Sequence, residues 1–150
     1  MDNALPHRSK VIVKVPCAII EHEGRILAAQ RAEGMSLSLK WEFPGGKIDG
    51  DETEIEALVR EIKEELNVEV SIGARQSEVY KDDTHRVICL IPYICELITT
   101  QITLTEHRQY RWLTPEELPN LDWAEADIVV LNNYLKSIKT QPHQAGSAPA

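Results

Sequence analysis

Apolar and β-branched positions predict a β-hairpin near the start of this chain. Residues 11–21 (VIVKVPCAIIE) are mostly apolar and β-branched, which is typical of a strand, and Pro16 indicates an edge-paired or bulged position. Residues 22–24 form a short turn, in which His22 is expected to be solvated. Residues 25–30 (RILAAQ) then predict the partner strand of a hairpin.

Several later segments also have the pattern of strands, with one irregular stretch between them. Residues 86–97 (RVICLIPYICEL) form the longest apolar run and predict a central strand, whereas residues 31–40 have no sustained period and predict a loop. The remaining extended segments are predicted at residues 41–44, 68–74, 77–81 and 109–113.

A helical period begins directly after Thr53. Thr53 and Glu56 have the spacing of a capping box, and Asn67 stands where helices commonly end in a left-handed residue. Ala57 is expected on the open, acidic side, where it leaves room for something to approach. The predicted core stripe consists of Ile55, Leu58, Val59, Ile62 and Leu66.

A second helix is predicted at residues 122–136, with Ile128, Leu131 and Leu135 facing inward. Before it, Thr114 and Pro115 have the pattern of an N-cap followed by the first position of a short helix. Strands flanked by helices on two faces predict an α/β protein, an α/β/α sandwich around a mixed sheet.

Composition limits the classes of function. A chain of 150 residues predicts one domain at residues 10–138, with a flexible lead at 1–9 and a disordered tail at 139–150. The net charge of -8 argues against a nucleic-acid polymer as partner, and the apolar runs are too short to span a membrane. Without a signal peptide, and with an odd number of widely spaced cysteines, the chain is expected in a reducing cytoplasm.

Three glutamates at the end of the first helix break two local rules. Glu61, Glu64 and Glu65 share one helix face and repel one another, and the helix dipole disfavours anions in the last turn. A divalent cation such as Mg²⁺ or Mn²⁺ would turn this repulsion into coordination. A solvated acidic face is the alternative.

Residues around this helix follow the spacing G-x5-E-x7-R-E-U-x-E-E-x-x-U, where U is aliphatic. They are Gly46, Glu52, Arg60, Glu61, Ile62, Glu64, Glu65 and Val68. The pattern resembles the Nudix box, although that family has a second glycine where Asn67 stands. Similarity outside the box, to the MutT-type branch, covers Gln30, Arg31, residues 40–47, Glu106 and residues 123–127.

The resemblance implies a set of metal-binding and catalytic residues. By similarity, the carboxylates of Glu61, Glu64 and Glu65 and the carbonyl of Gly45 bind Mg²⁺, and Glu106 is either a further ligand, a general base or a solvated loop carboxylate. Arg60 orients a metal-binding glutamate, or forms only a salt bridge with Glu56 or Glu64. Glu52 ties down the loop before the helix.

The resemblance also implies a substrate site. Arg31 is a candidate phosphate clamp, with a surface charge as its alternative, and Arg86 either faces the substrate or lies at the surface. Asp127 either reads the base edge or caps the last helix. Gly45 and Gly46 allow positive φ and a close backbone approach. The complete candidate substrate set is Arg31, Glu42, Phe43, Gly45, Gly46, Lys47, Arg86 and Asp127.

The implied activity is Mg²⁺-dependent conversion of a nucleoside triphosphate to the monophosphate and pyrophosphate. Asp127 favours CTP or dCTP, because a carboxylate accepts a hydrogen bond from the cytosine amino group. An 8-oxo-dGTP diphosphatase is the alternative, ahead of a nucleotide-sugar or dinucleoside polyphosphate hydrolase and of a non-catalytic nucleotide-binding regulator. The expected protein acts on a small nucleotide as a monomer or homodimer.

Overall fold

A computed structural model describes residues 10–139, which form one mixed β-sheet with helices on both faces. The helices are α2 (Glu54–Leu66) and α3 (Glu125–Lys139), and a short 3-10 helix, η2, spans Leu118–Asn120. The strands are β1 (Val11–His22), β2 (Arg25–Gln30), β3 (Trp41–Glu42), β4 (Val70–Arg75), β5 (Val79–Asp82), β6 (Arg86–Leu97) and β7 (Gln109–Leu113).

The sheet has the strand order β3-β2-β1-β6-β4, with β5 paired to β6 and β7 paired to β2. β1 and β6 run parallel along almost their whole length, from the pair Val11 and Arg86 to the pair Glu21 and Glu96. The other strand pairs are antiparallel, so the predicted mixed sheet is confirmed. The predicted hairpin of β1 and β2 is also confirmed, although these strands pair only next to their turn.

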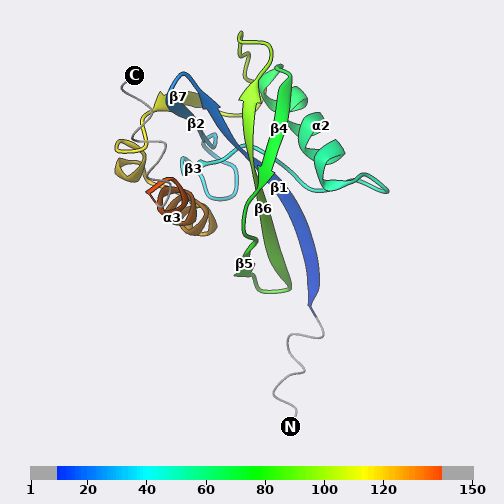
Figure 1. Cartoon of the computed structure of the whole chain (residues 1–150). Coiled ribbons are helices and arrows are strands. Elements are labelled where there is room, and N and C mark those ends of the chain that lie inside the picture. The colour runs from blue at the N-terminus through cyan, green and yellow to red at the C-terminus, as the bar shows by residue number, and fades with distance from the viewer. Residues whose placement is uncertain (1–9, 140–150) are drawn as a thin grey trace.

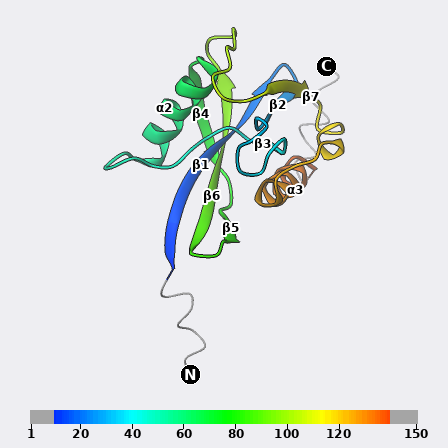
Figure 2. The same cartoon turned by 180° about the vertical axis from the view of Figure 1, so that it is seen from behind.

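Helices α2 and α3 cover opposite faces of the sheet (Figure 1), and the view from behind shows the same layers (Figure 2). Side chains of β1 alternate between the two faces, because successive residues of a strand point to opposite sides. Cys17 and Ile19 pack into the core cluster that contains α3 residues. Ala18 and Ile20 pack into the cluster beneath α2. The predicted α/β/α sandwich is therefore confirmed.

Helix α2 has the predicted ends but a different buried face. Thr53 and Glu56 form the capping box, and Asn67 ends the helix in the left-handed conformation with φ 57°. Ile55 and Val59 were expected in the core, yet they are 46% and 39% exposed, and Ala57 is fully buried.

The difference in α2 has a physical reason. The loop before the helix folds back along the acidic side, where the backbone carbonyl of Lys47 and the carboxylate of Glu52 bond Arg60. The loop therefore covers part of this side of the helix, although the side chain of Glu64 near its end is 59% exposed. Ala57 is fully buried, so the prediction that it lies open to an approaching group is wrong.

The last part of the chain also differs in detail from the prediction. The expected short helix is one turn closed by hydrogen bonds to the carbonyl of Thr114, followed by η2. Helix α3 begins later than expected and extends to Lys139, one residue beyond the predicted domain end. Ile128 was expected to face inward but is 43% exposed. The buried residues of α3 are Asp127, Val130, Leu131 and Tyr134.

Other expectations concern the ends of the chain and its cysteines. The predicted flexible lead at 1–9 and the tail from residue 140 lie outside the described residues. Neither helix within residues 10–139 combines the length and the apolar character needed to cross a membrane. Cys17, Cys89 and Cys95 are buried free thiols, as expected of core cysteines.

Candidate active site

The glycine pair that precedes α2 packs directly on the middle of β1. The Gly46 N–H donates to the carbonyl of Pro16 at 3.2 Å, and the Ala18 N–H donates to the carbonyl of Pro44 at 2.8 Å. A Cβ on Gly45 would lie 2.7 Å from the Cα of Cys17. Pro16 faces this loop on a side where β1 has no partner strand, which agrees with its predicted edge position.

The need for glycine at positions 45 and 46 comes from the close approach of neighbouring atoms, and not from an unusual backbone conformation. Neither Gly45 nor Gly46 has positive φ, so that part of the prediction is wrong. Within residues 10–139, the glycines with positive φ are Gly24, Gly34 and Gly50. A Cβ on Gly46 would instead collide with the carboxyl group of Glu61. The glycine pair therefore lets the loop pack between β1 and the acidic face of α2.

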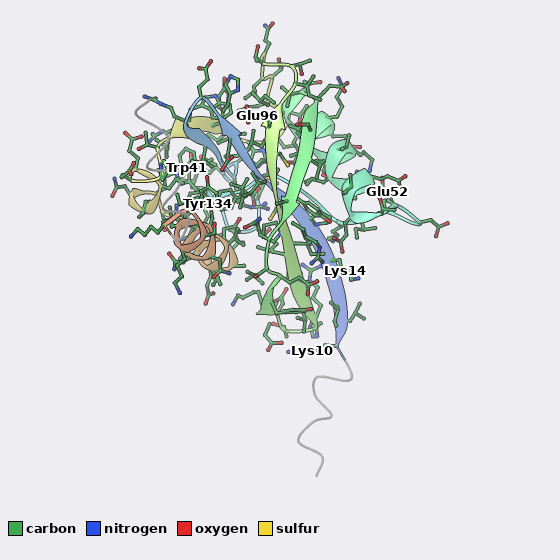
Figure 3. The ribbon with its side chains drawn as sticks, viewed as in Figure 1. Lys10, Lys14, Trp41, Glu52, Glu96 and Tyr134 are labelled. Carbon is green, nitrogen blue, oxygen red and sulfur yellow. The ribbon has the colours of Figure 1, made fainter. Side chains whose placement is uncertain are left out.

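Arg60 is the centre of an ion-pair network on α2. Its guanidinium binds both oxygens of Glu52, at 2.5 Å and 2.8 Å, and reaches Glu61 at 2.9 Å and Glu64 at 3.3 Å. Glu52, which lies at the start of the helix (Figure 3), also accepts the Asp49 N–H at 2.9 Å. Its pKa is lowered to about 2, first by the Arg60 hydrogen bond.

This network bears on two expectations. Glu52 ties down the loop, as predicted, because it joins Asp49 to Arg60. Arg60 forms the expected salt bridge with Glu64 but also bonds Glu61, and Glu56 serves in the capping box instead. Arg60 is therefore in a position to fix the direction of the Glu61 carboxylate.

Glu65 carries the strongest sign of an incomplete site. Its carboxylate accepts the Gly45 N–H, but its Oε1 atom is buried without any hydrogen-bond partner. The pKa of Glu65 is raised to about 9, first by burial and then by the nearby charges of Glu42 and Glu61, with a smaller contribution from Glu106. A cation with oxygen ligands would satisfy the orphaned oxygen and relieve this repulsion.

The carboxylates fit a hard divalent cation in type and charge, although they are not gathered around one point. Within residues 10–139, no three His, Cys, Asp or Glu side chains form a preformed metal cluster. Glu61 and Glu64 each direct an oxygen at Arg60. The predicted ligand set therefore remains a prediction, supported by the unpartnered oxygen of Glu65.

The loop before β7 is attached to the carboxyl end of α2. The hydroxyl of Thr105 donates to the carbonyl of Glu64 at 2.7 Å, and its N–H donates to the carbonyl of Glu65 at 3.2 Å. These bonds satisfy carbonyls that a helix end leaves free. They bring the exposed Glu106 close enough to Glu65 to contribute to its raised pKa, and the role of Glu106 stays a prediction.

A cleft of about 210 Å³ brings together most of the candidate residues. It is lined by Val15, Cys17, Arg31, Glu42, Phe43, Gly45, Gly46, Lys47, Glu65, Leu90 and Asp127. Arg86 is not among them: it bonds Asp83 at 3.3 Å and lines a neighbouring cavity with Ser36 and Lys81. The cleft therefore brings together Arg31, the candidate phosphate clamp, and Asp127, the candidate base-reading residue. Arg86 lies outside it.

Asp127 is a buried residue that lines this cleft. It belongs to the first turn of α3, is only 7% exposed, and its Oδ2 accepts the backbone N–H of Phe43 at 3.0 Å. Because helix α3 begins at Glu125, the alternative N-cap role is wrong. Burial, together with the charge of Glu42, raises the pKa of Asp127 to about 7.

Arg31 is held at the rim of the cleft. Its Nε and Nη2 donate to the carbonyl and hydroxyl of Ser36 at 2.6 Å and 3.1 Å, and its Nη1 donates to Glu42 at 3.1 Å. A guanidinium carries five N–H groups, so two remain after these three bonds. With its side chain 20% exposed, Arg31 is not a freely solvated surface charge.

The sequence interpretation missed His107. Its ring is 5% exposed, its Nε2 lies 2.8 Å from Oε2 of Glu42, and its Nδ1 is buried without a partner. The one available signal was its place directly after Glu106, which carries no motif of its own. Nothing local indicated that its side chain would reach a residue on β3.

Comparison with known proteins agrees with the fold and the box. The family described as the NUDIX domain matches residues 10–134. The chain is 34% identical over 131 residues to the CTP pyrophosphohydrolase of Escherichia coli, an alignment covering 87% of this chain and 97% of the relative. It is 38% identical over 103 residues to the putative 8-oxo-dGTP diphosphatase 2 of Mycobacterium tuberculosis, covering 68% and 73% respectively.

Solved structures give the same assignment. The solution structure of the E. coli ORF135 protein matches with a TM-score of 0.79 at 33% identity, over 90% of this chain and 96% of that one. A MutT protein from Staphylococcus aureus matches with a TM-score of 0.70 at 41% identity, over 85% and 98%. With the family match covering most of its length, this protein belongs to the Nudix family.

Proposed function

We propose that this protein is a Mg²⁺-dependent nucleoside triphosphate pyrophosphohydrolase that releases a nucleoside monophosphate and pyrophosphate. The hydrolase class follows from the family, whose relatives here are named as pyrophosphohydrolases and diphosphatases. The observation that carries the proposal is the cleft that joins Glu65, with its unpartnered buried oxygen, to Asp127 at the base side.

Hydrolysis of a phosphoanhydride needs neutralised phosphate charge and a positioned water. Nudix hydrolases generally need a divalent metal. In this proposal Mg²⁺, or Mn²⁺ with the same preference for oxygen, supplies both functions when bound. Its ligands are Glu61, Glu64, Glu65 and the carbonyl of Gly45, and Glu106 acts as a further ligand or as general base.

The remaining residues bind and orient. Arg31 offers its two uncommitted N–H groups to phosphate oxygens, for which a guanidinium fork is well suited. Lys47 adds a second positive charge at the exposed mouth of the cleft. Arg60 holds Glu61 and does not touch the substrate.

The base side favours a cytosine nucleotide such as CTP or dCTP. An ionised Asp127 accepts from the cytosine amino group, and a CTP pyrophosphohydrolase is among the most similar relatives. A second candidate is 8-oxo-dGTP, because the pKa of Asp127 near 7 also allows a protonated carboxyl that donates to a base oxygen. Relatives named as 8-oxo-dGTP diphosphatases agree with this candidate.

Other functions have less support. The intact box from Arg60 to Glu65 argues against a regulator that has lost catalysis. A nucleotide-sugar or dinucleoside polyphosphate hydrolase is less favoured, because the relatives reported above are named for CTP and 8-oxo-dGTP. The proposed enzyme acts on a free nucleotide in the cytoplasm, as a monomer or homodimer, without a nucleic-acid or membrane partner.

A substrate panel tests the proposal. Purified protein with Mg²⁺ is assayed for pyrophosphate release from CTP, dCTP, 5-methyl-dCTP, 8-oxo-dGTP, the common nucleoside triphosphates and a nucleotide sugar. The proposal requires turnover of at least one triphosphate, with monophosphate and pyrophosphate as products. Turnover of the sugar nucleotide alone, or of none, would refute it.

A further inference from the structure

We infer that His107 is a positioning residue that acts through Glu42 to hold the phosphate clamp Arg31 in place. The inference rests on the proposed function, because it assigns a task to Arg31 during substrate binding. His107 lies outside the box, and no residue of the box bonds it in the described part of the chain.

Three side chains from different segments form a continuous chain of hydrogen bonds. His107 precedes β7, Glu42 ends β3, and Arg31 directly follows β2. The ring Nε2 of His107 lies 2.8 Å from Oε2 of Glu42, and Nη1 of Arg31 lies 3.1 Å from Oε1 of the same carboxylate. Both carboxylate oxygens are therefore engaged, so Glu42 serves as a connector between the imidazole and the guanidinium.

The donor of the His107 bond follows from its partner. An ionised carboxylate only accepts hydrogen bonds, so Nε2 is the nitrogen that donates. The other ring nitrogen, Nδ1, is buried without a partner. The bond to Glu42 is thus the polar contact that accounts for placing this ring, with its side chain 5% exposed, inside the site.

The backbone around His107 is fixed independently of its side chain. The N–H of Arg108 donates to the carbonyl of Gln30 at 2.9 Å, and the side chains of Gln109 and Gln30 bond at 2.7 Å. On the other side, Thr105 is attached to the end of α2. Loss of the imidazole should therefore leave the loop in place and release only Glu42.

Glu42 lies where such a release would affect substrate binding. Its charge contributes to the raised pKa of Glu65, on the side proposed to bind phosphates, and to that of Asp127, on the side proposed to bind the base. Its carboxylate is 17% exposed, and it is the acidic partner of Arg31. Without His107, Glu42 can turn, and Arg31 then keeps only its bonds to Ser36.

Steady-state kinetics of His107 variants, on the best substrate of the panel, test this role. His107→Ala should raise KM about tenfold and change kcat by less than about threefold, because a ground-state phosphate contact is weakened. His107→Gln should restore most of the lost affinity, since its amide nitrogen reaches about as far as Nε2. His107→Asn is one methylene shorter and should behave like the alanine variant.

His22→Ala is the matched control. His22 also bonds a carboxylate, that of Glu96 at 3.2 Å, but it lies at the end of β1, outside the cleft. Its loss should leave both kinetic constants near those of the wild type. A His107→Ala variant with wild-type KM, or a glutamine variant as weak as the alanine variant, would overturn the assignment.

A double-mutant cycle with Glu42→Gln shows whether His107 acts through Glu42. If it does, the combined variant should be little worse than either single variant, because both remove the same chain of contacts. Additive effects on KM would mean that His107 acts on the substrate by another route, and the inference would fail.

A measurement without turnover separates this inference from the proposed function. The side-chain nitrogen NMR signals of Arg31 in the free protein should change alike in His107→Ala and Glu42→Gln. Unchanged signals would overturn the positioning role even if the enzyme is active. If the wild type hydrolyses no nucleotide, the proposed function fails while these signals still decide whether His107 orders Arg31.

Discussion

Asp127 accepts the backbone N–H of Phe43 at 3.0 Å across 84 positions of sequence. This bond joins the first turn of α3 to the segment that enters the glycine pair. The Phe43 ring also packs against Trp123, with centroids 4.7 Å apart. Asp127, the residue proposed to read the base, is thus bonded to the backbone segment that continues into Gly45 and Gly46 beside the proposed phosphate site.

Replacing Asp127 should change the choice of base. Asp127→Asn can still accept from the Phe43 N–H, but its amide replaces an acceptor oxygen by a donor. One good base contact is worth ~1–3 kcal/mol of discrimination, so the ratio of kcat/KM for CTP over 8-oxo-dGTP should fall by about tenfold or more. Competition assays with both nucleotides measure this ratio, and an unchanged ratio would contradict the base-reading role.

The pH dependence of stability should also contain a contribution from Asp127. Its pKa is about 7 in the folded state and near its ordinary value of 3.8 in the unfolded chain. Between these values the folded state binds more protons, so the free energy of unfolding falls as pH rises through this window. The full shift corresponds to on the order of 4 kcal/mol above pH 7.

Thermal unfolding of Asp127→Asn beside the wild type tests that sign. The variant lacks the titrating group, so its Tm relative to wild type should increase from pH 5 to about pH 7 and level off above that pH. Titrating groups that do not interact with Asp127 cancel in the difference. A constant difference across this range would mean that the carboxyl of Asp127 is not perturbed by its burial.

The local features of this chain and its layer architecture were predictable, whereas individual long-range contacts were not. The capping box at Thr53 and the left-handed Asn67 depend on neighbours within one helix, and the structure has both as predicted. The burial of Ala57 depends on a loop that folds back onto the helix, which a helical period does not encode.

The same distinction applies to the site. The box glutamates and Arg31 follow from spacing and resemblance. His107 could not be found this way, because its significance comes from a contact with Glu42, 65 positions away. Arg86 shows the opposite case: its charge suggested a substrate contact, but the register of β6 places it beside Asp83, outside the cleft.

Gly46→Ala should impair activity through Glu61. An added Cβ would collide with the Glu61 carboxyl, so either this side chain or the loop must move. We expect kcat/KM to fall by about tenfold or more, the effect typical of a displaced metal-binding or positioning group.

Gly50→Ala provides the matched control for that variant. Gly50 has φ +57 with nothing near its missing Cβ, so alanine there costs ~1 kcal/mol of backbone strain without touching Glu61. Its Tm should fall while kcat/KM below Tm stays near wild type. The explanation by close approach fails if the two variants lose activity equally.

Arg60→Lys should reduce activity although it keeps the positive charge. Lysine cannot bind both oxygens of Glu52 while also holding Glu61, because it lacks the planar fork of the guanidinium. kcat should decrease more than KM increases, since Arg60 is not in contact with the substrate in the proposed site. A variant whose only change is a higher KM would instead place Arg60 at the phosphates.

Glu65→Gln should separate catalysis from stability. Pyrophosphate release should be lost, because the proposed metal site loses the carboxylate that lines the cleft with a buried, unpartnered oxygen. In metal-free buffer the Tm of the variant should be equal to or above that of wild type, since the ionised form of Glu65 is disfavoured by burial and by Glu42.

Added Mg²⁺ should raise the Tm of wild type and have a smaller effect on the variant, because a ligand that binds only the folded state stabilises it. Glu69→Gln, at an exposed carboxylate that pairs with Lys63 at 3.7 Å, is the control and should keep both the activity and the Mg²⁺ response. Normal turnover by Glu65→Gln would exclude this glutamate from the metal site.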